Sequence, residues 1–293
     1  MKQLKLWTAL ITPMKQSGEI HFEDLEKLIR RQERAGNGIL LIGSTGEGLA
    51  LSASEKREII AFADGLNLSV PVMAGVGGFQ VDEQKDWIHY CNGKNVDALL
   101  LVAPLYAKPG VEGQKAWFRS LLDEAEKPCM IYNIPSRTGV KIPPSVLIDL
   151  KDHPNFWSVK EASGSINDYM EFREKLPDVP LFSGDDGLMP FFAAAGSAGL
   201  VSVASNVWPE ETSFYVDCCL NGDTDSLFPV WKKAVEALFS APNPVPAKVL
   251  LKLKGIIESE MLRLPLTAAD VKEKQRLTKI DTEIINWYKN NKA

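Results

Sequence analysis

The sequence FWSVKEASGS, residues 156–165, is a continuous apolar run that ends at Lys160 and passes into small polar residues. A strand that is apolar on both faces is typical of a parallel sheet covered by helices on both sides, because a half-exposed strand would alternate. The eight runs of this kind predict eight buried parallel strands. They lie at residues 4–11, 38–44, 70–75, 97–103, 129–133, 156–160, 180–184 and 198–203.

Amphipathic segments separate these runs. Residues 21–36 carry an apolar stripe opposite a charged face, with Gly36 available to end a helix, and Ser52 with Glu55 fits a capping box that starts the next one. Repeated strand–helix units with right-handed crossovers close into a (β/α)8 barrel, the fold of TIM barrels. An open doubly wound sheet is the alternative for the same α/β pattern.

The pattern changes after Val203. Four segments read as helix with no strand between them, at 206–222, 225–240, 245–262 and 270–291. The first closes the barrel and the others predict a C-terminal helical appendage. We therefore expect a barrel carrying the active site over residues 1–223 and a helical region over 224–293.

Composition excludes several classes of function. The 293 residues carry a formal net charge of -5 with no long basic run, which argues against a nucleic-acid partner. No apolar run is long enough for a membrane span, so we expect a soluble, cytoplasmic protein. The four cysteines lack CxxC spacing and predict buried, reduced thiols. Three scattered histidines predict surface or capping roles, and we expect neither a metal nor a cofactor.

Lys160 is the central candidate, because reactive groups of a strand–helix barrel lie at the carboxyl ends of the strands. An amine enclosed there readily lowers its pKa from about 10.4. A neutral amine attacks carbonyl carbon and forms a Schiff base. A structural ion pair with an acidic residue is the alternative for this lysine.

Other strand ends supply groups that such chemistry needs. Tyr132 and Ser44 offer hydroxyls that can relay protons. The sequence GSTGEG at 43–48 lacks the lysine of a phosphate loop and instead predicts a nest of backbone N–H groups for a carboxylate. Arg137 could hold a second carboxylate, although an exposed loop arginine is the simpler interpretation.

Five motifs, in order along nearly the whole chain, resemble those of the dihydrodipicolinate synthase and N-acetylneuraminate lyase family of Schiff-base aldolases. They are GSTGEG at 43–48, YNIPSRTG at 132–139, KEASG at 160–164, SGDD at 183–186 and NPVPAK at 243–248.

The resemblance implies a catalytic group of four residues. Lys160 would form an imine with pyruvate, and Tyr132 would pass protons through Ser44 to Tyr106, which in this family enters the active site of a neighbouring subunit. Ser44 stands where threonine is usual, and the hydroxyl is retained. The family usually builds a homotetramer from two dimers, so we expect a homo-oligomer.

The resemblance also implies substrate contacts. Backbone groups of Ser44 and Thr45 would cradle the pyruvate carboxylate, and Gly184 and Val201 would supply main-chain contacts near the imine. Arg137 in its SRTG setting would bind the carboxylate of aspartate 4-semialdehyde.

The hypothesis that follows is a lyase that condenses pyruvate with aspartate 4-semialdehyde to 4-hydroxy-tetrahydrodipicolinate, on the diaminopimelate route to lysine. One alternative is another pyruvate-dependent aldolase, cleaving N-acetylneuraminate or a keto-sugar acid. A second is a non-catalytic barrel that binds a keto acid. The dimer-interface pocket through which lysine inhibits some members is altered here, which predicts weak or absent inhibition. The altered positions are Ala53, Lys56, Phe79 and Leu105, whereas Glu83 remains.

Overall fold

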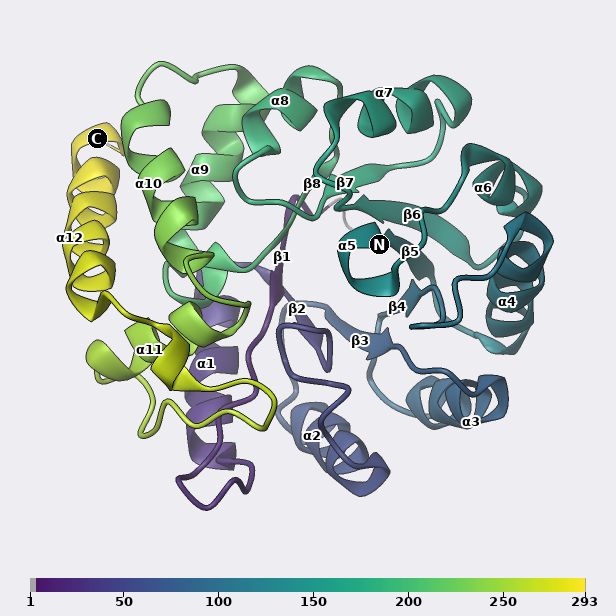
Figure 1. Ribbon diagram of the computed structural model, residues 1–293, viewed down its shortest axis with the longest axis horizontal. Helices are drawn as coiled ribbons and strands as arrows, with labels where there is room; N and C mark the ends of the chain where they lie inside the picture. Colours follow the sequence, from purple (N-terminus) through teal and green to yellow (C-terminus); the bar gives the residue numbers. More distant parts are fainter. Residues whose placement is uncertain (1–3, 293) are drawn as a thin grey trace.

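The computed structural model describes residues 4–292. Eight parallel strands close into a barrel in chain order, and β1 pairs with β8 to complete the ring (Figure 1). This confirms the predicted (β/α)8 barrel and excludes the open sheet. The strands are β1 (Leu6–Ala9), β2 (Gly38–Leu41), β3 (Val72–Val76), β4 (Ala98–Val102), β5 (Cys129–Asn133), β6 (Phe156–Glu161), β7 (Leu181–Ser183) and β8 (Gly199–Ser202).

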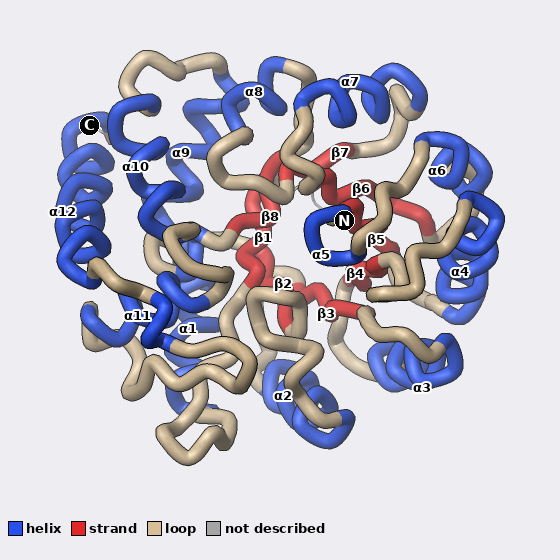
Figure 2. The backbone as a smooth tube through the Cα atoms, in the orientation of Figure 1, coloured by secondary structure: helices blue, strands red, loops and turns tan. Residues whose placement is uncertain are grey.

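Helices surround the strands, as Figure 2 shows. The predicted capping box is confirmed at Ser52 and Glu55, and Gly36 ends the first helix with a left-handed φ of 72°. His21 caps that helix by accepting a hydrogen bond from the N–H of Asp24, which confirms a capping role. The helices of the barrel are α1 (Phe22–Ala35), α2 (Ala53–Gly65), α3 (Val81–Asn92), α4 (Val111–Glu124), α5 (Pro135–Thr138), α6 (Pro144–Leu150), α7 (Ile166–Lys175), α8 (Met189–Ala194) and α9 (Pro209–Asn221).

The barrel is filled by side chains. Inward-facing residues form a cluster of their own, and outward-facing ones pack beneath the helices, so each strand is buried on both faces. The inner cluster lies directly beneath the site at the carboxyl ends of the strands. It includes Trp7, Leu40, Met73, Leu100, Met130, Tyr132, Phe182 and Val201.

Residues 224–292 contain three α-helices, α10 (Phe228–Leu238), α11 (Val245–Leu253) and α12 (Lys274–Asn291), and the short 3-10 helix η2 (Ala268–Asp270). The predicted helix over 245–262 is wrong in its second half. Gly255 adopts a left-handed φ of 67°, and α11 ends two residues before it. The last predicted helix likewise starts only at Lys274.

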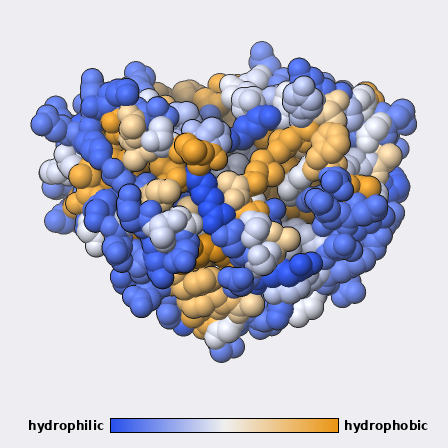
Figure 3. Space-filling view, turned by 60° about the horizontal axis from the view of Figure 1, so that its bottom comes forward, coloured by the Kyte–Doolittle hydropathy of each residue, from blue (hydrophilic) through white to orange (hydrophobic). Residues whose placement is uncertain are grey.

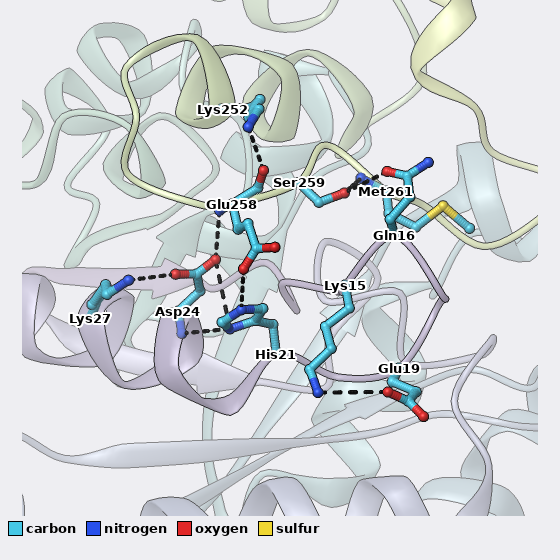
Figure 4. A network of polar contacts seen from close by, with 10 residues as sticks. All are labelled: Lys15, Gln16, Glu19, His21, Asp24, Lys27, Lys252, Glu258, Ser259 and Met261. Atoms are coloured by element: carbon cyan, nitrogen blue, oxygen red, sulfur yellow. Dashed lines mark hydrogen bonds and ion pairs between the residues drawn. The ribbon is translucent and has the colours of Figure 1, made fainter.

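Residues 256–263, which we call the strap, form instead an irregular segment that lies against α1 and the loop before it. The N–H of Glu258 donates to Asp24 at 2.7 Å, and the Glu258 carboxylate lies 2.7 Å from Nε2 of His21 (Figure 4). Ser259 donates to Gln16 at 3.2 Å. The strap therefore joins the C-terminal region to α1 and to the loop before it.

The structure also bears on the predicted state of the cysteines and on the search for membrane-spanning helices. The four cysteines are free and buried, as expected. Among residues 4–292, no helix has the length and apolarity needed to cross a membrane.

Candidate active site

Lys160 and Tyr132 lie side by side at the mouth of the barrel. They are register partners on the neighbouring strands β6 and β5, and both are buried. The Lys160 Nζ atom lies 4.2 Å from the centre of the Tyr132 ring. Strand pairing therefore brings together, from 28 positions apart, the two residues that the sequence placed at the centre of the chemistry.

The environment of Lys160 favours the neutral amine. Burial lowers the pKa of Lys160 to about 7, Asp186 acts in the opposite direction, and the positive charge of Arg137 lowers the pKa further. Within the described part of the chain, Nζ makes no hydrogen bond or ion pair. A substantial fraction of the amine is uncharged at neutral pH, so the predicted nucleophile is available.

Tyr132 has the opposite property. Burial raises the pKa of its phenol to about 12, while Arg137 and a hydrogen bond with the Ser44 side chain work to lower that pKa. The phenol therefore keeps its proton at neutral pH. A protonated phenol is chemically able to donate a proton to a substrate oxygen, and its hydrogen bond joins it to the hydroxyl of Ser44.

A cavity of about 610 Å³ opens above Lys160. Gly184 forms part of its wall, and a Cβ atom there would lie only 2.8 Å from Cε of Lys160 and 2.6 Å from Cβ of Ala162. Only glycine leaves room for the lysine side chain in its present position. Other lining residues come from α5 and from four loops, and they include Ser44, Thr45, Ser136, Arg137, Ser163, Asp185, Phe239 and Asn243.

The turn after β2 carries two free backbone N–H groups and is a candidate anion site. The backbone N–H groups of Ser44 and Thr45 have no acceptor among residues 4–292, and both residues line the cavity. Other groups of the turn are already engaged: Thr12 donates to the carbonyl of Gly46 at 2.7 Å, and Asn243 donates to Oγ1 of Thr45 at 2.9 Å. Successive free N–H groups beside Lys160 fit a carboxylate.

Arg137 lies at the rim of the cavity on α5. It is exposed, and its guanidinium donates to the carbonyl of Asn243 at 3.3 Å. One end of the site is therefore cationic although the chain is acidic overall.

Two predicted residues lie outside the cavity. Tyr106 is 92% exposed and belongs to an adjoining groove of about 920 Å³, which meets the cavity at Ser44, Tyr132 and Arg137. Val201 is buried in the inner cluster below. Val203, two residues further on, lines the cavity instead.

Sequence reasoning missed two contributors to the site. The segment 239–243 forms one wall, although the sequence only placed it between two predicted helices and at the start of the NPVPAK motif. Asp186 is fully buried and accepts hydrogen bonds from Ser202 at 2.5 Å and from the N–H of Val203 at 3.0 Å. Burial raises its pKa to about 6, so its charge near Lys160 depends on pH. Residues 4–292 contain no cluster of three or more His, Cys, Asp or Glu side chains that could hold a metal.

Comparison with known proteins gives a consistent result. The sequence pattern of the Dihydrodipicolinate synthetase family matches residues 2–284. The 4-hydroxy-tetrahydrodipicolinate synthase of Francisella philomiragia is 47% identical over 287 residues, which cover 97% of each chain. A chloride-inhibited dihydrodipicolinate synthase of Acinetobacter baumannii, solved in complex with pyruvate, superimposes with a TM-score of 0.90 at 28% identity, covering 97% of this chain and 99% of that one. A monomeric dihydrodipicolinate synthase variant gives a TM-score of 0.84 at 28% identity, covering 96% of this chain and 97% of that one.

Proposed function

The chain belongs to the dihydrodipicolinate synthetase family, and from that membership we propose that Lys160 condenses pyruvate with L-aspartate 4-semialdehyde to 4-hydroxy-tetrahydrodipicolinate. The enzyme is a lyase of the diaminopimelate route to lysine. The observation that carries the assignment of Lys160 is its buried amine, with a pKa of about 7, against the ring of Tyr132.

The first half of the reaction forms an enamine on the enzyme. The neutral amine of Lys160 attacks the keto carbon of pyruvate, and the hydroxyl of the resulting carbinolamine leaves as water with a proton from Tyr132. The iminium nitrogen then draws electrons from the methyl group, which gives a proton to the Tyr132 phenolate and so restores the phenol. The N–H groups of Ser44 and Thr45 hold the substrate carboxylate throughout.

The second half forms the carbon–carbon bond. The enamine carbon attacks the aldehyde carbon of the semialdehyde, and the aldehyde oxygen takes a proton. The amino group of the same substrate then attacks the imine carbon, which closes the ring and releases Lys160. Condensation loses one water overall.

Arg137 is the group that we assign to the second substrate. Its guanidinium at the rim of the cavity matches the carboxylate of the semialdehyde. Gly184 keeps the space beside Lys160 open, and we assign main-chain contacts near the imine to Gly184 and Val201.

The oligomeric part of the proposal concerns Tyr106. This side chain belongs to the groove that adjoins the cavity, which the exposed residue Leu49 also lines. Figure 3 shows apolar side chains gathered among charged ones on the side of the molecule that carries α2. We infer that two copies pair here, that Tyr106 completes the relay in the partner, and that two such dimers form a tetramer. The substrates are small water-soluble carboxylates, and we place the enzyme in the cytoplasm.

Borohydride reduction in the presence of pyruvate tests the nucleophile. Reduction of the imine should add one pyruvate-derived group to the chain, and peptide mapping should locate it on Lys160. Adduct that persists in Lys160→Ala would refute the assignment. A coupled assay with pyruvate and aspartate semialdehyde then tests the product.

A further inference from the structure

A buried ion pair lies directly behind the turn of Ser44 and Thr45. Nζ of Lys248 on α11 lies 2.5 Å from Oε1 of Glu47, and the two side chains are 0% and 1% exposed. Neither residue lines the cavity or the adjoining groove. The reaction as derived above uses neither of them.

The pair is tied into the strap through its remaining polar atoms. Oε2 of Glu47 accepts a hydrogen bond from the N–H of Arg263 at 2.9 Å, and Lys248 donates to the carbonyl of Met261 at 2.9 Å. The strap is itself anchored on α1 and on Gln16, as described above (Figure 4). Glu47 is therefore held from two sides by segments that are fixed elsewhere.

The backbone at Glu47 explains why holding this residue matters. Glu47 has a positive φ of 54°, a conformation that side-chain-bearing residues rarely adopt. Its N–H donates to the carbonyl of Ser44 at 3.2 Å, so the turn folds back on itself. Rotation at Glu47 would change the direction of the N–H groups two and three residues earlier.

We propose that the Lys248–Glu47 ion pair is a positioning element for the keto-acid carboxylate. It fixes the turn so that the N–H groups of Ser44 and Thr45 point into the cavity before substrate arrives. This inference rests on the proposed function, because it assigns those N–H groups to the carboxylate of the imine-forming substrate. Both residues act through the turn, and neither touches the substrate.

The double variant Glu47→Met/Lys248→Met tests the inference. Replacing both charges by apolar groups of similar volume preserves charge balance and is commonly tolerated by folded proteins. The tether to the turn is lost, however, and with it the fixed orientation of the N–H groups. Loss of one charge-assisted hydrogen bond of ordinary strength between the turn and the substrate carboxylate should raise KM for pyruvate about tenfold. Since ground state and transition state share this contact, kcat should change by less than about threefold.

The choice of KM separates positioning from stability. KM does not depend on enzyme concentration, so partial unfolding lowers the apparent kcat and leaves KM unchanged. Lys254→Met is the matched control, because it removes the ion pair with Asp281 just after α11 without touching the turn. It should lower the melting temperature and leave KM for pyruvate unchanged. If the double variant does not fold, Glu47→Gln keeps the shape and should raise KM about threefold.

The outcomes are distinct. KM for pyruvate within about twofold of wild type in a folded double variant, or in Glu47→Gln where that is measured, overturns the inference. An equal rise of KM in Lys254→Met also overturns it, because the effect would then be general loosening. Failure of borohydride to trap pyruvate on the wild-type enzyme refutes the proposed function itself, and this inference falls with it.

Discussion

Lys160 at the mouth of the barrel and Lys248 on α11 are both buried, with exposed fractions of 5% and 0%. Burial lowers the pKa of each amine. Lys248 has the carboxylate of Glu47 at hydrogen-bonding distance, which opposes that shift, whereas Lys160 faces an aromatic ring and an open cavity. Because both amines are buried, the comparison teaches that the group within reach of the amine distinguishes a candidate nucleophile from one member of an ion pair.

The largest expected effect is loss of activity in Lys160→Met. Removal of a covalent nucleophile should lower kcat by roughly 10⁴-fold or more. Lys248→Met should retain imine formation with saturating pyruvate in its folded fraction. Steady-state kinetics and borohydride trapping of both variants check this contrast. Measurable turnover in Lys160→Met would contradict the prediction.

Stability should change in the reverse order. Lys248→Met leaves the carboxylate of Glu47 buried without its cation, which should lower the free energy of unfolding by about 3–5 kcal/mol. Lys160→Met removes a buried amine that makes no hydrogen bond or ion pair with a carboxylate of residues 4–292, so the free energy of unfolding should be equal or higher. Denaturant titration measures both. A larger loss in Lys160→Met would show that Lys160 has a structural partner.

Arg137→Ala tests the rim of the cavity. Loss of a bidentate carboxylate contact should raise KM for aspartate semialdehyde about 10- to 100-fold. Trapping of pyruvate on Lys160 should persist, because the guanidinium does not hold the first substrate. Steady-state kinetics with each substrate varied in turn separates the two effects. A rise confined to KM for pyruvate would move Arg137 to the other carboxylate.

The pH dependence follows from the environment of Lys160. Its pKa of about 7 means that protonation removes the nucleophile as the pH falls through 7. The value of kcat/KM for pyruvate should therefore drop about tenfold per pH unit below that point. In Arg137→Ala the limb should move to higher pH, because the arginine lowers the pKa of Lys160. An unchanged limb in that variant would leave burial as the sole cause.

Lys56 is a third, partly buried lysine, and it concerns the smallest expected effect, the inhibition of turnover by free lysine. It lies in the groove beside Glu83; burial lowers its pKa, and Glu83 opposes the shift. An incoming lysine ammonium would meet this amine and the apolar side chains of Ala53 and Leu105. A dissociation constant of about 1 mM corresponds to about 4 kcal/mol of binding free energy, and we expect lysine to bind more weakly than that. Addition of about 1 mM lysine should therefore change turnover by less than about twofold. Strong inhibition in a steady-state assay would contradict this prediction.

Much of the fold was predictable because strand burial leaves a direct signal. Continuous apolar runs located all eight strands, and their ends located Lys160 and Tyr132. The GSTGEG sequence also indicated a turn with free N–H groups. These features depend on residues that are close in sequence or on the regular geometry of a barrel.

The remainder depended on contacts between distant segments. The apolar residues of 256–262 continue the pattern of α11, and only Gly255 signals that the helix ends, so the strap was not predictable from periodicity. Glu47 and Lys248 lie 201 positions apart, and nothing in either local sequence identifies the partner. The cavity wall at Asn243 was missed for the same reason.

The anchoring of the Ser44 turn by α11 and the strap has a consequence for synthesis. In the proposed arrangement, all eight strands leave the ribosome before the anion site is fixed, because Lys248 follows Ser202, the last residue of β8, and lies 201 positions after Glu47. A nascent barrel can thus enclose the amine of Lys160 before the N–H groups of Ser44 and Thr45 are held in position for a keto-acid carboxylate. Competence for catalysis arrives with the last fifth of the polypeptide.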